Sequence, residues 1–359
     1  MRYILDVSTL DNSASGAKQR FLSLYTELIK RNKKKKFLII YTSFINVKKY
    51  FNFSNVTFKK NKFGQDTYLK KIISTIYIYF FILVNSKKIK SVEYFTLPFL
   101  KIKKCKVFFT IHDLRRIKFS NILLKKFAYK IFFKFFLKRA DNIIVVSETI
   151  KKEIYGYFRD LKVRVIYNTI NLKLFSKISK KKLNFVKKKY KLPSNFIISV
   201  GHQETRKNYL RLIRAIKILN EDKQKINLII IGQKANETKN IKKLIKDLNL
   251  SSRVKIFENL SDSELRCFYR LSDLFVFPSI YEGFGIPILE SMASDIPIVL
   301  SDSEIFREIT LNKYIYFDPY DPLSIATKIK YVLSDKNLIN NMISFGKRRV
   351  EMFTIAKQS

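Results

Sequence analysis

Cysteine, glycine and proline are scarce in this chain of 359 residues, and tryptophan is absent. The two cysteines, Cys105 and Cys267, lie far apart, with no Cys-x-x-Cys spacing and no histidine cluster beside them. This pattern indicates neither a disulfide framework nor a zinc site, and it fits a reducing compartment. The apolar stretch before the first polar residues is too short for a signal peptide. We therefore expect a cytoplasmic protein.

Long hydrophobic runs are also lacking. The longest covers residues 72–84 between lysine-rich flanks, whereas a helix that spans a bilayer needs about 20 apolar residues. We therefore expect a buried or interfacial helix here. The whole chain is 47% hydrophobic, which is enough to build more than one core. Its length exceeds what one core usually supports, so two domains are expected.

Acidic residues are few, and their deficit is uneven. The chain has 71 Lys and Arg against 29 Asp and Glu, a formal charge of +42, and residues 1–180 hold 40 of the basic and 10 of the acidic residues. Enrichment in Lys, Ile, Asn, Phe and Tyr is also what A+T-rich codons produce, so the distribution is more informative than the total. Zinc-finger spacing, an RNP motif and a basic tail are all absent, so no nucleic-acid partner is expected.

One basic segment has a helical pattern. In residues 120–140, Lys126, Lys130, Lys134 and Lys138 recur every four residues and phenylalanines fill much of the remaining surface. Such a helix could lie on an anionic membrane surface, with the four lysines as the binding candidates. The alternative is an ordinary core helix whose lysines are solvated. The pattern leaves both interpretations open.

Short apolar runs alternate with longer helical segments throughout the chain, which is typical of βαβ units with a parallel sheet. A lysine-dense helix and a turn at residues 177–194 interrupt this alternation, and a second cycle follows. We predict an α/β fold of two Rossmann-like, doubly wound parallel-sheet domains facing across a cleft. The predicted parts are residues 1–180, residues 181–340 and a short C-terminal helical segment, 341–359, that returns toward the first domain. Ligands of such sheets bind beyond the carboxyl ends of the strands.

Five of the eight glycines follow predicted strands: Gly16, Gly201, Gly232, Gly283 and Gly285. At such turns a backbone can approach a phosphate closely. No G-x-G-x-x-G or G-x-x-x-x-G-K-[ST] sequence occurs, which argues against a dinucleotide fingerprint and a P-loop.

Residues 271–306 contain no Lys or Arg, in contrast to the rest of the chain. This window places Glu282 and Gly283 on a loop after a strand, and Pro287 and Glu290 on the helix that follows. Backbone amides near that helix start could face an anionic or hydroxyl-rich ligand, and carboxylates can bind the vicinal hydroxyls of sugars. Alternatively, Glu282 is a helix-start anion and Glu290 a solvated surface residue.

The motif EGFGIPILE at residues 282–290 resembles the E-x7-E signature of retaining GT-B glycosyltransferases of family 4. Further segments resemble the family in the same order along the chain. They are TIHDL at 110–114, ADNIIVVSE at 140–148, VIYNTINLKLF at 165–175, VGHQETRKNYLRLIRA at 200–215 and LSDSELRCFYRLSDLFVFPS at 260–279.

The resemblance implies roles for the second domain. Arg206 and Lys207, after Gly201, would bind the donor diphosphate without a metal ion. Glu290 would bind the nucleotide ribose, and Glu282 the hydroxyls of the donor sugar.

Further roles follow from the same resemblance. The backbone of Gly283, Phe284 and Gly285 would surround the sugar, and Phe257 would lie near the nucleotide base. On the first domain, His112 would contact the transferring sugar, and Gly16 would belong to a loop that approaches the donor.

Three departures from the family pattern stand out. His202 replaces a frequent arginine, Asp295 replaces a frequent glycine, and residues 352–359 lack the usual tryptophan of the final helix. We expect the last of these departures to weaken the closing element and so to affect domain closure and rate most.

The resulting expectation is a retaining, metal-independent hexosyltransferase without a cofactor. It would move a sugar, with mannose as the candidate, from a GDP- or UDP-linked donor to a glycan or lipid-linked acceptor. This reaction would serve cell-surface polysaccharide or glycolipid synthesis at the inner face of the cytoplasmic membrane. The alternatives are a catalytically silent family member that binds sugar nucleotides or membranes, and an epimerase on the same fold.

Overall fold

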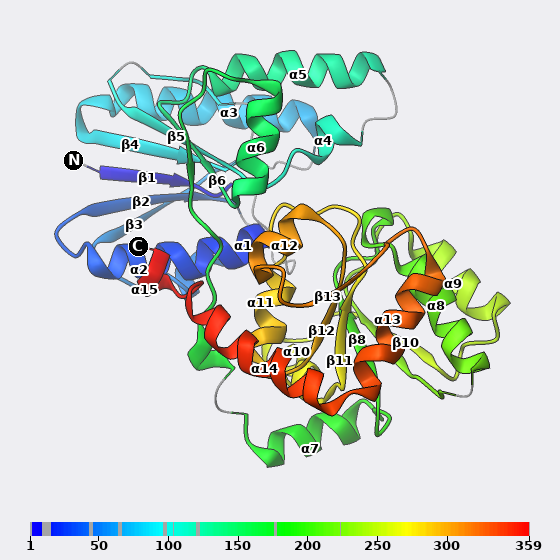
Figure 1. The fold of residues 1–359 in the computed structure, drawn as a ribbon. Helices are drawn as coiled ribbons and strands as arrows, with labels where there is room; N and C mark the ends of the chain where they lie inside the picture. The colour runs from blue at the N-terminus through cyan, green and yellow to red at the C-terminus, as the bar shows by residue number, and fades with distance from the viewer. Residues whose placement is uncertain are drawn as a thin grey trace. The chain divides into compact units, whose positions relative to one another are not determined.

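The computed structural model describes residues 2–8, 16–42, 46–63, 67–95, 99–102, 104–119, 123–175, 178–222 and 224–358 (Figure 1). The chain divides into unit 1, Met1–Thr169 with Gln358–Ser359, and unit 2, Ile170–Lys357. The predicted boundary at residue 180 thus lies inside unit 2, where helix α7 begins, and the predicted boundary at 341 lies inside helix α14. Each unit is built around one sheet, which confirms the predicted pair of parallel-sheet α/β domains.

The sheet of unit 1 has seven parallel strands in the order β3-β2-β1-β4-β5-β6-β7. Their bounds are Arg2–Asp6 (β1), Lys36–Tyr41 (β2), Val56–Lys60 (β3), Ile89–Tyr94 (β4), Lys106–Ile111 (β5), Asn142–Val145 (β6) and Val163–Val165 (β7). The strand order reverses at β1, which lies between β2 and β4. The β1 end is therefore the topological switch point of this sheet.

Helices cover both faces of this sheet (Figure 1). They are α1 (Gly16–Arg20), α2 (Thr26–Arg31), α3 (Tyr68–Val84), α4 (Arg115–Lys118), α5 (Leu123–Leu137) and α6 (Glu148–Tyr157), with a π-helical turn at Phe21–Tyr25 between α1 and α2. The β3-to-β4, β5-to-β6 and β6-to-β7 connections cross the sheet in one direction, and β1-to-β2 crosses in the other. Because such crossovers are right-handed, α3, α5 and α6 cover one face and α1 and α2 cover the opposite face.

Aromatic side chains fill the core between this sheet and α1–α2. The ring of Phe21 lies 4.9 Å from that of Phe51 and 5.9 Å from that of Phe95, and Tyr25 packs edge-on against Phe95. All four side chains are buried. Offset and edge-to-face ring pairs of this kind add about 1 kcal/mol each beyond the burial of their area.

The sheet of unit 2 has six parallel strands in the order β10-β9-β8-β11-β12-β13. Their bounds are Ile197–Val200 (β8), Leu228–Ile231 (β9), Val254–Phe257 (β10), Leu274–Phe277 (β11), Ile298–Ser301 (β12) and Ile315–Phe317 (β13). The strands β8, β9, β11 and β12 are buried along their whole length, as expected for parallel strands covered on both faces. Here the order reverses at β8, so the β8 end is the switch point.

The helices of unit 2 precede its first strand, connect the strands or form the C-terminal segment. They are α7 (Lys180–Lys189), α8 (Tyr209–Glu221), α9 (Thr238–Asp247), α10 (Asp262–Leu271), α11 (Ile286–Ala293), α12 (Glu304–Thr310), α13 (Pro322–Ser334), α14 (Lys336–Glu351) and α15 (Ile355–Gln358). After α14 the chain passes Ile170, whose N–H donates to the carbonyl oxygen of Phe353 at 2.9 Å. This hydrogen bond joins the first and last parts of unit 2.

A capping box begins helix α10. The Ser261 hydroxyl accepts from the N–H of Glu264 at 3.3 Å, and the Glu264 carboxylate accepts from the N–H of Ser261 at 3.0 Å. Glu264 also accepts from Lys189 at 2.6 Å. The hydrogen bonds from Lys189 and Ser261 lower the pKa of Glu264 to about 2. The box thus joins the start of α10 to the end of α7.

Replacing Ser261 by alanine is expected to destabilise unit 2 by about 1 kcal/mol, the usual cost of losing an N-cap side chain. Urea unfolding followed by circular dichroism measures this change. Ser252→Ala, in an exposed turn, is the control and should change the free energy of unfolding by less than about 0.5 kcal/mol. Equal effects of the two substitutions would contradict the importance of the cap.

Candidate functional site

The candidate site of unit 2 lies at the carboxyl end of β8, the switch point of its sheet. After Gly201 the chain forms a single 3-10 turn at Thr205–Lys207 before α8 begins. Asn208 ends this turn in the left-handed conformation at φ 60°. The Asn208 amide donates to the carbonyl oxygens of Pro278 at 3.1 Å and Pro319 at 2.6 Å, which fixes the turn near the ends of β11 and β13.

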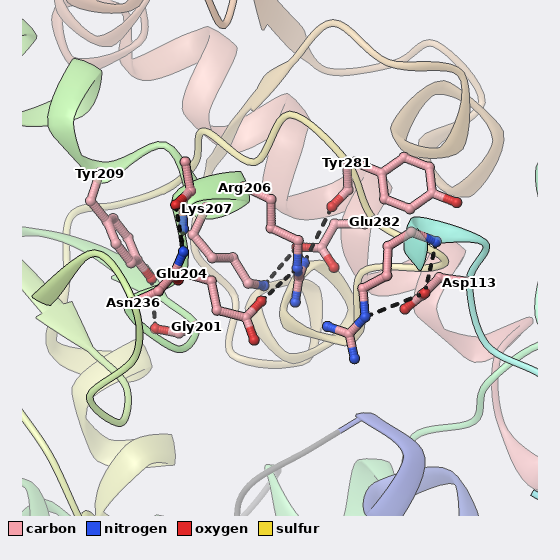
Figure 2. Close-up of polar contacts among 11 residues, drawn as sticks. Asp113, Gly201, Glu204, Arg206, Lys207, Tyr209, Asn236, Tyr281 and Glu282 are labelled. Carbon is pink, nitrogen blue, oxygen red and sulfur yellow. Dashed lines mark hydrogen bonds and ion pairs between the residues drawn. The ribbon is translucent and has the colours of Figure 1, made fainter. Parts of the chain in front are cut away.

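Arg206 and Lys207 meet Glu282 in one ion-pair cluster, as Figure 2 shows. Lys207 Nζ lies 2.6 Å and Arg206 Nη1 2.7 Å from Glu282 Oε1. A second carboxylate, that of Glu204, lies 2.6 Å from Arg206 Nε. The structure thus brings Arg206, Lys207 and Glu282 together with Glu204, while their predicted roles toward a donor stay predictions.

Burial sets the electrostatics of this cluster. The side chains of Lys207 and Glu282 are 8% and 12% exposed. Burial lowers the pKa of the Lys207 ammonium, because loss of water disfavours the charged form, although the Glu282 carboxylate opposes this shift. Burial alone would raise the pKa of Glu282, but Lys207 and Arg206 outweigh it and the pKa of this carboxyl is lowered. Glu282 is therefore ionised at neutral pH.

Two hydrogen bonds to backbone carbonyl oxygens join the Arg206 turn to the loop that carries Glu282. The N–H of Ile280 donates to the carbonyl oxygen of Arg206 at 2.8 Å, and Arg206 Nη1 donates to the carbonyl oxygen of Tyr281 at 3.2 Å. Residues 206 and 280–282 are far apart in sequence, but these bonds hold them at fixed separation. The two cations therefore keep their positions without depending on the ion pair alone.

Gly201 leaves room for the Lys207 stem, which passes directly over it. A Cβ atom at position 201 would lie 2.7 Å from Lys207 Cε, well inside contact distance. The carbonyl oxygen of Gly201 accepts from Tyr209 Oη at 2.8 Å. Lys207 Nζ also lies 4.9 Å from the centroid of the Phe277 ring, so the stem is enclosed between backbone and aromatic ring.

Helix α11 positions the second predicted carboxylate. Gly285 begins the helix with φ 108°, a conformation that glycine adopts without strain. Glu290 lies one turn inside and is only 7% exposed, so the interpretation of it as a solvated surface residue is wrong. Its carboxylate accepts from Tyr269 Oη at 2.9 Å. Because a buried carboxylate needs partners, Tyr269 both satisfies and orients Glu290.

The loop between Glu282 and α11 contains Phe284, whose side chain and backbone have different surroundings. Gly283 and Phe284 form a bend before Gly285. The Phe284 side chain is buried and packs edge-on against Phe353, with ring centroids 5.8 Å apart. Any contact of Phe284 with a ligand therefore comes from its backbone.

Phe257 ends β10, at the same edge of the sheet as the ion-pair cluster. Its half-buried ring lies 5.4 Å from that of Tyr190 and 5.2 Å from that of Phe268, both edge-on. The ring thus belongs to an aromatic cluster with α10 and the end of α7. Its predicted contact with a nucleotide base stays a prediction.

His112 and Gly16 belong to unit 1. His112 follows β5, and its Nε2 is buried without a hydrogen-bond partner among the described residues. Gly16 is the first residue of α1, so it lies at a helix start, while the predicted loop before it falls outside the described residues. The predicted proximity of both residues to the donor stays a prediction.

His112 is expected to be neutral at physiological pH, because burial and the charges of Arg20 and Arg115 lower its pKa to about 3. The folded state thus binds fewer protons than the unfolded state, whose histidine titrates near pH 6.5. This neutral histidine contributes stability above pH 6.5 that is lost progressively as the pH falls toward 3. Between pH 7 and 4 the wild type should lose about 3 kcal/mol more stability than His112→Asn. Denaturation at several pH values measures this, and parallel profiles would contradict it.

The four lysines of the membrane-binding prediction lie on or just after α5. Lys134 and Lys138 are exposed, whereas Lys126 and Lys130 are half-buried. Lys130 Nζ lies 4.8 Å from the ring centroid of Tyr157. The exposed side of α5 therefore differs from the lysine stripe seen in the sequence, since it also contains Phe127 and other apolar residues.

Two site residues had not been predicted. Glu204 lies two positions before Arg206, and its charge in a basic chain was a usable signal. Tyr269 comes from α10, and no local sequence pattern connects it with Glu290. Across the described ranges, His, Cys, Asp and Glu side chains form no group of three or more suited to a metal ion.

Comparisons with known families cover most of the chain. The family described as "Glycosyl transferases group 1" matches residues 180–349, and "Glycosyltransferase Family 4" matches residues 89–174. The first match contains Arg206, Lys207, Glu282 and Glu290, and the second contains His112.

Curated relatives include bacterial mannosyltransferases. The O-antigen chain mannosyltransferase RfbU of Salmonella typhimurium is 29% identical over 271 residues, which are 74% of this chain and 71% of the relative. The serotype-specific mannosyltransferase WbdA of Escherichia coli is 31% identical over 205 residues, 55% of this chain and 25% of that protein. The chain thus spans only about a quarter of WbdA.

Solved structures share the fold over nearly the full length. A glycosyltransferase from Rickettsia africae has a TM-score of 0.75 at 18% identity, covering 99% of this chain and 95% of the other. The Anabaena protein HepE, solved with UDP and glucose, has a TM-score of 0.76 at 15% identity, covering 99% and 96%. These likenesses confirm the GT-B fold class.

Proposed function

Because the chain belongs to glycosyltransferase family 4, we propose that it transfers a sugar from a nucleotide diphosphate sugar with retention of anomeric configuration. The acceptor is a glycan or a lipid-linked molecule in cell-surface polysaccharide or glycolipid synthesis. Mannose is the proposed sugar, since RfbU and WbdA are mannosyltransferases by name. The donor base is guanine or uracil.

The observation that carries this proposal is the cluster of Arg206 and Lys207 at the β8 end. A diphosphate leaving group gains negative charge as its bond to the sugar breaks. Two cations held by backbone hydrogen bonds and burial are arranged before the reaction, so they stabilise that charge with little reorganisation. Here Arg206 and Lys207 do what a metal ion does in other transferases.

The two carboxylates suit the uncharged parts of the donor. An ionised carboxylate accepts hydrogen bonds from adjacent hydroxyls. In the proposed complex Glu290, oriented by Tyr269, binds the ribose hydroxyls, and Glu282 binds hydroxyls of the transferred sugar. The backbone at residues 283–285 lines the same ligand.

Retention needs no covalent sugar intermediate in this proposal. Two cations within 2.7 Å hold the Glu282 carboxylate, which makes it a poor nucleophile, whereas double displacement requires a free one. Instead, the acceptor hydroxyl attacks the anomeric carbon on the face from which the diphosphate leaves. The carbon–oxygen bond to the diphosphate breaks, a bond to the acceptor oxygen forms, and a diphosphate oxygen takes the hydroxyl proton.

Unit 1 supplies the acceptor side in this proposal. His112, neutral by virtue of its lowered pKa, contacts a sugar hydroxyl as a hydrogen-bonding group and carries no charge. The protein would work in the cytoplasm at the inner face of the cytoplasmic membrane, held by the basic residues of α5. Among the described helices none is both long and apolar enough to cross a bilayer.

Calorimetry with a panel of GDP- and UDP-sugars, combined with a transfer and hydrolysis assay, tests the proposal. Glu290→Ala should weaken donor binding about ten- to a hundredfold, because it removes charged hydrogen bonds. Glu304→Ala, an exposed carboxylate at the start of α12, should leave it unchanged. Binding without turnover of any donor would favour the catalytically silent alternative, and product epimers without transfer would favour an epimerase.

A further inference from the structure

Two helices of unit 1 expose apolar side chains on the side that faces away from the sheet. Helix α3 exposes Leu69, Ile73, Ile76, Phe80, Leu83 and Val84, and helix α5 exposes Leu123, Leu124, Phe127, Ile131 and Phe135. We call these residues the α3–α5 surface. The sequence pattern had indicated a buried or interfacial helix at 72–84, and α3 proves to be buried on one side only, through Ile78 and Ile82.

The α3 residues form a regular stripe. From Leu69 to Leu83 the exposed positions are separated by four, three, four and three residues, which keeps them on one side of a helix. The helix has 17 residues and is therefore about 25 Å long. Soluble monomers rarely expose contiguous apolar area of this extent, and such area marks an interaction site.

Helices α3 and α5 lie in the same layer. Their crossovers run in the same direction along the sheet, so both cover the face opposite α1 and α2 (Figure 1). The connection from β4 to β5 contains no helix in its described residues. Helices α3 and α5 therefore follow one another in this layer, and both exposed stripes lie on this face of unit 1.

Charge indicates what this surface binds. Neither α3 nor α5 contains an Asp or Glu, and both contain lysines. Lys134 and Lys138 follow Ile131 by three and seven residues, which places them among the exposed apolar side chains of α5. Lysine is depleted from the cores of protein interfaces. At a lipid surface its stem can lie in the apolar layer while the ammonium group reaches anionic headgroups.

We propose that the α3–α5 surface docks unit 1 on an anionic lipid bilayer, with both helices lying in the interfacial plane. The apolar side chains insert beneath the headgroups, and Lys70, Lys134 and Lys138 contact lipid phosphates. This inference rests on the proposed membrane location and replaces a lysine stripe on one helix by an apolar surface on two. It is independent of the chemistry at Arg206 and Glu282.

Sedimentation of the full chain with phosphatidylcholine vesicles, with and without an equal part of phosphatidylglycerol, tests this proposal. The wild type should sediment with the anionic vesicles. Ile76→Gln/Phe80→Gln on α3 and Phe127→Gln/Ile131→Gln on α5 should each lower the partition coefficient at least about tenfold. Lys134→Gln/Lys138→Gln should lower it roughly twenty-fivefold, because each lysine near an anionic surface contributes about fivefold.

Helix α7 of unit 2 provides the matched control, because it exposes Phe185 among many lysines. Phe185→Gln and Lys181→Gln/Lys188→Gln should change the partition coefficient less than about twofold. Thermal melts should show that all variants fold, and hydrolysis of the donor in solution should be unchanged, which separates this test from that of the proposed function.

Three outcomes would overturn the proposal. The first is a wild type that stays in the supernatant with both vesicle types. The second is a control on α7 that loses as much binding as the α5 lysine pair, because general charge would then explain the association. The third is an α3 or α5 variant that binds vesicles as the wild type does. Light scattering that shows a dimer only in the wild type, without vesicle binding, would assign the surface to a second copy.

Discussion

Lys207→Met is expected to lower kcat/KM for sugar transfer by about 10²- to 10³-fold, the usual cost of removing one preorganised group that stabilises transition-state charge. Methionine keeps an apolar stem of similar length over Phe277 and Gly201, so the loss reports the ammonium charge. Glu282 remains paired with Arg206 at 2.7 Å, so no carboxylate is left buried and unpaired. We therefore expect the fold to be retained, and initial rates with saturating acceptor measure the effect.

Lys217→Met is the matched control for this substitution. Lys217 lies on α8, close in sequence to Lys207, but its side chain is 37% exposed and pairs with Glu221 on the same helix. It should transfer sugar at the wild-type rate. If Lys207→Met kept more than about a tenth of the wild-type kcat/KM, the role of Lys207 at the leaving group would be wrong.

Strands whose residues are apolar throughout, such as β9 and β11, can be predicted from local patterns in the sequence. Such patterns do not predict β4, although β4 is central in its sheet. This strand contains Lys90, Ser91 and Glu93, whereas a strand buried on both faces is normally apolar. Glu93 is accommodated because it accepts hydrogen bonds from Tyr25 and from Thr110, the latter at 2.7 Å. Its partners come from α1–α2 and β5, so no local pattern could predict the strand.

In the candidate site, too, some features can be predicted from local sequence and others depend on contacts with distant residues. Arg206, Lys207 and Glu282 stood out because a glycine, a basic pair and a lysine-free window are local features of the sequence. The burial of Glu290 could not be predicted, since it depends on Tyr269 from another helix. Likewise, the outward stripe of α3 followed from the topology, because the same apolar run is compatible with a fully buried helix.

Gly232→Ala is expected to be the most damaging single substitution for stability among those proposed. Gly232 follows β9, next to the β8 end, and a Cβ atom there would lie 1.8 Å from the carbonyl oxygen of Gly201. Because the obstacle is backbone, no rotamer change can relieve the clash. Separating β8 and β9 would also disturb the hydrogen bond from Gly232 N–H to Phe257 at 3.0 Å. We expect a loss of more than about 4 kcal/mol, which is a large part of the roughly 5–15 kcal/mol by which most domains are stable.

Gly156→Ala and Gly201→Ala are the comparison variants for this prediction. A Cβ at position 156, near the end of α6, meets nothing within 4 Å, so this variant should be neutral or more stable by about 0.5 kcal/mol. At position 201 the nearest atoms belong to the movable end of Lys207, although the φ of 154° strains a residue with a Cβ. Gly201→Ala should therefore lose donor binding and less stability than Gly232→Ala. Thermal melts of the three variants should show stability falling from Gly156→Ala through Gly201→Ala to Gly232→Ala, and donor titration should show the loss of binding in Gly201→Ala. A folded, active Gly232→Ala would mean that the β8 and β9 ends can separate, and the rigidity that we assign to the Arg206 and Lys207 turn would then be lost with it.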